Sequence, residues 1–208
     1  SRFVKDWDKL VIDEYNKCEK YWGRMVFSHH PAGYMRKLNY DIYNKPLEPH
    51  YSFAVWNEEV RMLQPVWYAC QYSEYGNEGY FLCANSLFCR SDIIKEVPYD
   101  KELYFIGEEP SLTIRLYTRN IRIINPAFNY MYHQYNPPGN PVKRRLHWED
   151  NKDWYEMNKK SYERLARIMT GDTELEEYGV GSFRRFEEYQ QKIGVDLESK
   201  YNEIAGWG

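Results

Sequence analysis

Residues 105–135 constrain the fold of this chain more than any other segment, because they combine two adjacent acids with the start of a helix. Glu108 and Glu109 follow Gly107 and precede Pro110. Proline is favoured at the first position of a helix, where its missing N–H would have had no partner. We therefore expect a helix that begins at the two acids, where unpaired N–H groups and the helix dipole stabilise negative charge.

The residues after this helix predict that the chain returns as β-structure. Two segments, IRII at 121–124 and FNYMYH at 128–133, are rich in β-branched and aromatic residues and are separated by Asn125-Pro126. Such a path would carry His133 back beside the two acids. The sequence therefore predicts that this stretch forms the floor of an active site.

Apolar periodicity predicts the other elements. Residues spaced by three and four indicate helices at about 6–20 and 150–170, and a further helix that ends at Gly194. Apolar runs predict strands at 25–30, 51–56, 60–72 and 79–83, with a long connection over 35–51 and a helix start near residue 91.

The order of these elements predicts the fold class. Helices alternate with strands through the first two thirds of the 208 residues, and helices alone follow. This order is typical of an α/β core with a helical C-terminal cover. We expect residues 1–150 to form the core and residues 151–208 to form a helical extension packed on it.

The composition limits the classes of function. The formal net charge is −3 with acids and bases interspersed, which argues against a nucleic-acid-binding surface. Aromatic residues make up 18% of the chain, including 21 tyrosines and 7 tryptophans. Rings of this kind suit a cleft for sugars or peptides, because the ring face covers C–H groups while the phenol or indole forms hydrogen bonds. Trp67 is one candidate for such a platform.

The chain contains four cysteines and none of the spacings that mark a metal or redox motif. We expect reduced thiols and a cytoplasmic location. No apolar run in these 208 residues is long enough to span a membrane, and we expect no signal peptide among them.

Three segments together resemble the GlcNAc-transferase family of the GT-A glycosyltransferase superfamily, which includes the hydroxyproline GlcNAc-transferases. They are SRFVKDWD at 1–8, NSLFCRSDIIKEVPYDKELYFIGEEPSLTIRLYT at 85–118 with an H-x-Y at 133–135, and YGVGSFRRFEEYQQKIGVD at 178–196. The middle segment is also similar, more distantly, to the polypeptide N-acetylgalactosaminyltransferases. The resemblance implies a GT-A-like, Rossmann-related mixed sheet. It further implies the metal-dependent transfer of a sugar, expected to be GlcNAc, from a UDP-sugar to a hydroxyl group on a protein or glycan.

The resemblance also implies a metal ligand and two catalytic acids. It assigns His133 to Mn²⁺ or Mg²⁺, which would neutralise the departing diphosphate. Of Glu108 and Glu109, one could accept hydrogen bonds from substrate hydroxyls, and the other could act as a base if the reaction inverts configuration, or simply cap the helix. If the reaction retains configuration, neither acid needs to deprotonate the acceptor.

Further residues are candidates for substrate binding. Asn85 and Ser86 lie in a turn where they could donate to the sugar or phosphate. The corner His29-His30-Pro31, at the end of a predicted strand, is a candidate cleft wall, because ligands of open α/β sheets bind beyond the carboxyl ends of the strands. His29 and Tyr34 also fall where an acceptor loop would lie, and Arg115 matches an arginine of the N-acetylgalactosaminyltransferase pattern.

The family pattern places its Asp-Ser-His form of the metal-binding motif directly before the segment that begins at Ser1. The nucleotide-binding strands are therefore expected outside this chain. We expect the chain alone to bind UDP poorly, even with Mn²⁺, and tight binding in calorimetry would contradict this placement.

Two other classes of function remain open from the sequence. One is a carbohydrate- or peptide-binding module without catalysis, in which the acids only cap a helix. The other is a metal hydrolase, which ranks last because the histidines show no H-x-x-x-H or similar ligand spacing. These histidines are His29, His30, His50, His133 and His147.

Overall fold

The computed structural model describes residues 1–37, 40–45, 49–135 and 145–205, and it is a mixed α/β structure. The strands are β1 (Arg2–Phe3), β2 (Met25–Ser28), β3 (Ala32–Arg36), β4 (Asp41–Tyr43), β5 (His50–Asn57), β6 (Met62–Ala69), β7 (Asn77–Gly79), β8 (Leu87–Phe88), β9 (Arg122–Asn125) and β10 (Met131–His133). The helices are α1 (Trp7–Trp22), α2 (Ser91–Glu96), α3 (Glu108–Thr118), α4 (His147–Asp150), α5 (Trp154–Met169), the 3-10 helix η1 (Thr173–Tyr178), α6 (Phe186–Ile193) and α7 (Leu197–Ala205).

Two parallel strand pairs organise the sheets. One sheet has the order β7-β9-β2-β8, with β2 parallel to β9. The second has the order β1-β10-β3-β4, with β3 parallel to β10. The chain passes from β2 to β3 and from β9 to β10, so the same two stretches of chain run side by side through both sheets. In the second pair His133 lies opposite Gly33. The predicted β-structure after α3 is therefore confirmed, whereas the position of His133 beside the two acids stays a prediction.

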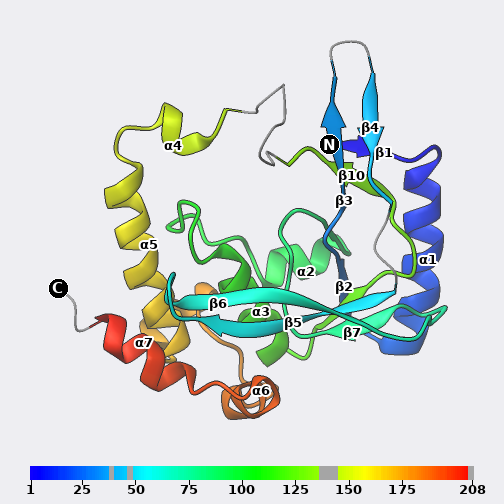
Figure 1. Ribbon diagram of the computed structural model, residues 1–208. Helices are drawn as coiled ribbons and strands as arrows, with labels where there is room; N and C mark the ends of the chain where they lie inside the picture. Colours follow the sequence, from blue (N-terminus) through cyan, green and yellow to red (C-terminus); the bar gives the residue numbers. More distant parts are fainter. Residues whose placement is uncertain (38–39, 46–48, 136–144, 206–208) are drawn as a thin grey trace.

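Helices cover both faces of the β2–β9 pair. Met25 and Phe27 pack in a cluster with Val11 and Cys18 of α1, whereas Val26 packs in a cluster with α2 and α3. Every residue of β2 is buried, as expected for a strand with a helix on each face. Figure 1 shows α1 on one side of the molecule and α5 and α7 on the other.

The C-terminal helices share a core with the rest of the chain. Leu165, Tyr189 and Tyr201 pack in one cluster with Ala54 of β5 and Ile114 of α3. The helical cover is thus present, and the division into residues 1–150 and 151–208 stays a prediction. No helix in the described part of the chain is long and apolar enough to cross a membrane.

Two sequence predictions differ from the structure. Residues 35–51 are not a plain connection, because β3 extends to Arg36 and pairs with β4. Residues 80–83 are apolar but form no strand. The N–H of Leu82 donates instead to the Thr113 hydroxyl at 2.9 Å, and the Ser52 hydroxyl donates to the Phe81 carbonyl at 2.6 Å. Side chains thus satisfy the backbone groups that a neighbouring strand would have used.

Candidate functional site

The candidate site lies where β2 and β10 end and α3 begins. The chain leaves β2 at His29 and His30, and it leaves β10 toward Tyr135. Glu108 and Glu109 begin α3, and the inner face of the β5–β6 hairpin adds Trp67, which packs against His30. In open α/β sheets, ligands bind beyond the carboxyl ends of the strands, and this corner has that position.

The two acids occupy the predicted helix start. Gly107 precedes them with a φ of 92°, a conformation that glycine adopts without strain. Neither carboxylate caps the helix. An oxygen of Glu109 instead accepts a hydrogen bond from the N–H of Ala84 at 2.8 Å, which ties α3 to the turn at residues 83–86.

The environment of the two acids raises both pKa values. Burial, and secondarily the neighbouring charge of Glu109, raises the pKa of Glu108 to about 7. Burial also raises the pKa of Glu109, but the hydrogen bond from Ala84 opposes this effect because it stabilises the ionised form. Near neutral pH, Glu108 is therefore able to accept or donate a proton, whereas Glu109 holds a hydrogen bond through one of its oxygens.

A cluster of rings lies next to Glu109. The hydroxyl of Tyr135 lies 3.2 Å from Nδ1 of His30, and it donates its proton to the carbonyl of Pro31 at 3.1 Å. His30 must then be the donor to Tyr135, which leaves the lone pair on Nε2 of His30. The His30 ring also packs 4.5 Å from the ring of Trp67, and the thiol of Cys83 lies 4.0 Å from Nδ1. Burial keeps this thiol protonated by raising its pKa to about 12.

His133 adjoins the same cluster. Its ring centroid lies 4.8 Å from that of Tyr135, and its Nδ1 lies 3.4 Å from the hydroxyl of Ser1. Across the described ranges, no group of three or more His, Cys, Asp or Glu side chains is arranged to hold a metal ion. The described residues thus do not build a complete metal centre here.

Ser86 and His29 are both buried, and their side chains contact each other. The Ser86 hydroxyl lies 3.0 Å from Nδ1 of His29 and 2.7 Å from the hydroxyl of Tyr130. Only 3% of the His29 surface is exposed, and burial lowers the pKa of its imidazole to about 3. Asn85, between Cys83 and Ser86 in the same turn, is exposed. Of the predicted polar residues in this turn, only Asn85 faces solvent.

Tyr34 and Arg115 are not brought to this corner. Tyr34 is buried in β3, where its ring stacks 5.7 Å from that of Tyr43. Arg115 is fully buried and donates to the carbonyls of Pro98 at 2.8 Å and Glu177 at 3.1 Å. Burial lowers the pKa of its guanidinium to about 10. Arg115 therefore connects α3 to the segments before and after it.

Two residues of the site were not predicted from the sequence as its parts: Cys83 and Tyr135. The tyrosine was visible only as the last letter of the H-x-Y segment. His30 was expected, together with His29, in the wall of a cleft beyond the end of a strand. Strand alternation could have separated the two histidines, since consecutive side chains point to opposite faces. No feature of the sequence indicated that Cys83 belongs to the site, because its position depends on the irregular backbone of residues 80–83.

The comparisons with known proteins gave one match. A family model described as "Glycosyltransferase (GlcNAc)" matches residues 1–199. The match includes every residue of the site described above. No curated protein and no solved structure gives a significant match.

Proposed function

Because this chain belongs to the Glycosyltransferase (GlcNAc) family and is thus a glycosyltransferase, we propose that it transfers GlcNAc from UDP-GlcNAc to a hydroxyl group of a protein or glycan. We further propose a GT-A-type fold. The parallel pair β2–β9, with helices on both faces and the acids at the strand ends, supports this assignment.

The proposal depends chiefly on one arrangement, the two half-buried acids Glu108 and Glu109 at the start of α3, where burial raises the pKa of Glu108 to about 7. A group with a pKa near the working pH is suited to exchange a proton with a reacting hydroxyl. In an inverting reaction, Glu108 accepts the proton of the acceptor hydroxyl. In a retaining reaction, it accepts a hydrogen bond from that hydroxyl without taking the proton.

The other residues of the corner have supporting roles in this proposal. One oxygen of Glu109 is occupied by the N–H of Ala84, so its other oxygen is left to accept a hydrogen bond from a sugar hydroxyl. The Trp67, His30 and Tyr135 rings form a wall of the kind that covers sugar C–H groups. Asn85 is an exposed amide at the edge of the corner.

A divalent cation is part of the proposal as well. Mn²⁺ or Mg²⁺ would neutralise the departing diphosphate, with His133 as its imidazole ligand. The free cysteines support a reducing compartment, and we place the protein in the cytoplasm; these thiols are Cys18, Cys70, Cys83 and Cys89.

The test compares Glu108→Gln with a matched control, Glu156→Gln, which changes an exposed acid of α5. The complete natural protein is incubated with UDP-GlcNAc, Mn²⁺ and a library of hydroxyl-bearing peptides and glycans, and UDP release and acceptor mass are measured. We expect Glu108→Gln to lower turnover roughly a hundredfold or more while the KM for UDP-GlcNAc changes about twofold at most. The control should behave as wild type.

Unchanged turnover in Glu108→Gln would refute the catalytic role of this acid. Binding of sugars or peptides without any transfer or UDP release would instead favour a non-catalytic carbohydrate- or peptide-binding module.

A further inference from the structure

The acids of the site are connected to a helix that lies outside the sheets. Residues 100–107 lead directly into Glu108, and they run along α5. Three residues of α5 contact this segment: Ser161, Arg164 and Leu165. Their spacing of three and four places them on one face of the helix.

Ser161 supplies a hydrogen bond to the middle of the segment. Its hydroxyl accepts from the N–H of Tyr104 at 2.9 Å and donates to the carbonyl of Met157 at 3.0 Å. The hydroxyl is thus bonded on both sides, and Ser161 itself is buried. Its position fixes the backbone of the segment four residues before Glu108.

Arg164 holds the beginning of the segment through an ion pair. Its Nε lies 2.9 Å from a carboxylate oxygen of Asp100, whose side chain is 0% exposed. The other oxygen of Asp100 accepts from the N–H of Glu102 at 3.0 Å. Both carboxylate oxygens are therefore used to hold the turn against α5.

Leu165 packs against the last residue before the acids. A Cβ placed on Gly107 would lie 3.2 to 3.5 Å from three carbons of the Leu165 side chain. This contact leaves no room for the helix start to move toward α5. Because Gly107 has a φ of 92°, a larger residue could not replace it without strain.

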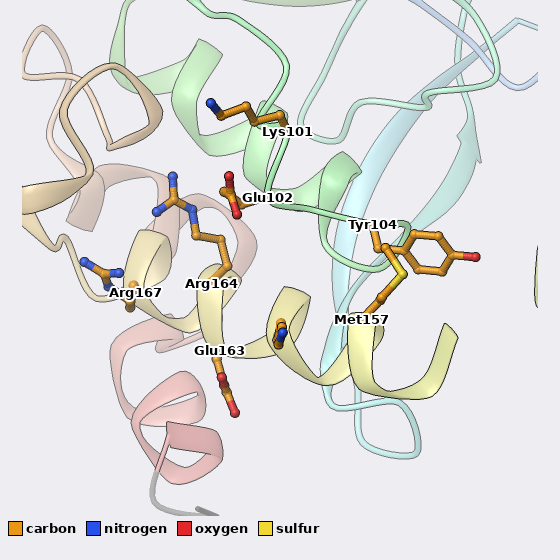
Figure 2. Close-up of a pocket in the computed structure, with 8 residues that line it drawn as sticks. Lys101, Glu102, Tyr104, Met157, Glu163, Arg164 and Arg167 are labelled. Atoms are coloured by element: carbon orange, nitrogen blue, oxygen red, sulfur yellow. The ribbon is translucent and has the colours of Figure 1, made fainter. Parts of the chain in front are cut away.

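The outer side of the segment is open. A groove of about 420 Å³ lies between residues 101–104 and α5. Figure 2 shows residues that line it, with Lys101, Glu102 and Tyr104 from the segment and Arg164 from α5. Asn151 also donates to the hydroxyl of Tyr104 at 3.3 Å, but the three contacts with α5 are those that reach the backbone and the buried carboxylate of the segment.

We propose that Ser161, Arg164 and Leu165 are positioning residues, which hold the 100–107 segment and thereby fix the Glu108–Glu109 pair in the geometry needed for sugar transfer. This inference rests on the proposed function for its catalytic consequence. Its structural consequence, the control of the environment of Glu108 by α5, does not depend on that function.

The variants separate positioning from general destabilisation. Leu165→Ala removes the packing on Gly107, Ser161→Ala removes the hydrogen bond to Tyr104, and Arg164→Met removes the ion pair. Arg164→Lys keeps a cation beside Asp100 and should rescue most of the effect of Arg164→Met.

Two controls complete the set. Ile193→Ala weakens the same apolar cluster from α6, and Glu156→Gln changes an exposed acid of α5 that does not line the groove.

The first readout is the ¹³C NMR titration of the Glu108 carboxyl group, assigned by its loss in Glu108→Gln. In Leu165→Ala, Ser161→Ala and Arg164→Met we expect the midpoint to fall from about 7 toward 4.5, because a loosened corner admits water.

The second readout is kinetic. In the complete protein, kcat should fall on the order of tenfold or more in the same variants, with the KM for UDP-GlcNAc unchanged.

A wild-type midpoint in Ser161→Ala and Arg164→Met would overturn the inference, as would an equal shift in Ile193→Ala. These milder variants keep the test decisive if Leu165→Ala does not fold. If the complete protein transfers no sugar, the proposed function fails, whereas the titration still decides whether α5 positions the acids.

Discussion

The hydroxyl of Tyr135 joins the ends of two parallel chain segments, because it contacts Nδ1 of His30 at 3.2 Å and the carbonyl of Pro31 at 3.1 Å. His30 follows β2, and Tyr135 follows β10 by two residues. One phenol therefore sets the distance between the segment that carries His133 and the wall formed by Trp67 and His30.

Tyr135→Phe should disturb this junction. The substitution leaves the His30 N–H without its acceptor and the Pro31 carbonyl without its donor, so we expect a loss of about 1–3 kcal/mol in the free energy of unfolding. Turnover should fall as well, since the wall and the His133 segment are no longer held together. Tyr132→Phe is the matched control, because the Tyr132 hydroxyl bonds to no described residue. Equal stability losses in urea unfolding of both variants would contradict this role of the hydroxyl.

The raised pKa of Glu108 predicts that this acid costs stability at high pH. Its folded pKa of about 7 exceeds the ordinary value of 4.5, so the folded state binds the proton more tightly. The contribution of the protonated Glu108 to the free energy of unfolding is fully present below about pH 4.5 and is lost as the pH rises through 7.

Glu108→Gln should therefore stabilise the fold by about 1–2 kcal/mol at about pH 8, after allowance for solvent screening, and change little at about pH 4. Urea unfolding of this variant and of Glu156→Gln at both pH values measures the effect. A variant that is less stable than wild type at the higher pH would show that the carboxylate is stabilised rather than strained in the fold. The turnover of the wild-type protein should also change with pH around pH 7, and this change should be absent in Glu108→Gln.

The buried His29 predicts a loss of stability at mildly acidic pH. Burial lowers its folded pKa to about 3 from an ordinary value of 6.5, so the unfolded chain takes up a proton that the folded chain excludes. The stability from this group is present above 6.5 and is lost as the pH falls below it. Between about pH 7 and pH 5 this single group should cost about 2 kcal/mol.

Unfolding measured at both pH values in wild type, His29→Gln and His133→Asn tests the assignment. The glutamine variant should lose less stability on acidification than wild type, because it has no imidazole to protonate. His133→Asn is the control, since His133 is only half-buried. If it flattened the pH dependence as much as His29→Gln, the effect would not belong to the buried imidazole.

The sequence predicted the local features of the site better than its long-range contacts. The helix start at Glu108 and the return through β9 and β10 followed from the proline position and from β-type composition, which depend on neighbours in the chain. The burial of Ser86 could not be predicted, because it depends on His29, 57 residues away. The hydrogen bond between Tyr104 and Ser161 spans the same separation and leaves no periodic signal. Contacts of this kind arise only once the layers pack.

Substitution of Arg115 tests whether this residue binds substrate, as the family resemblance suggested, or stabilises the fold. Its guanidinium is fully buried and bonds to the Pro98 and Glu177 carbonyls, which joins α3 to the segment before α3 and to η1. Both bonds come from the one nitrogen Nη2, and the shorter lysine side chain would have to bury its strongly hydrated ammonium group to reach the same two carbonyls. We expect Arg115→Lys to lower the free energy of unfolding by about 2–4 kcal/mol, whereas Arg185→Lys, at an exposed arginine, should change it by about 0.5 kcal/mol at most. At a temperature where the variant remains folded, the KM values for donor and acceptor should equal those of wild type. A raised KM with unchanged stability would instead show that Arg115 binds substrate. Binding would then require the contact between α3 and η1 to open during the reaction.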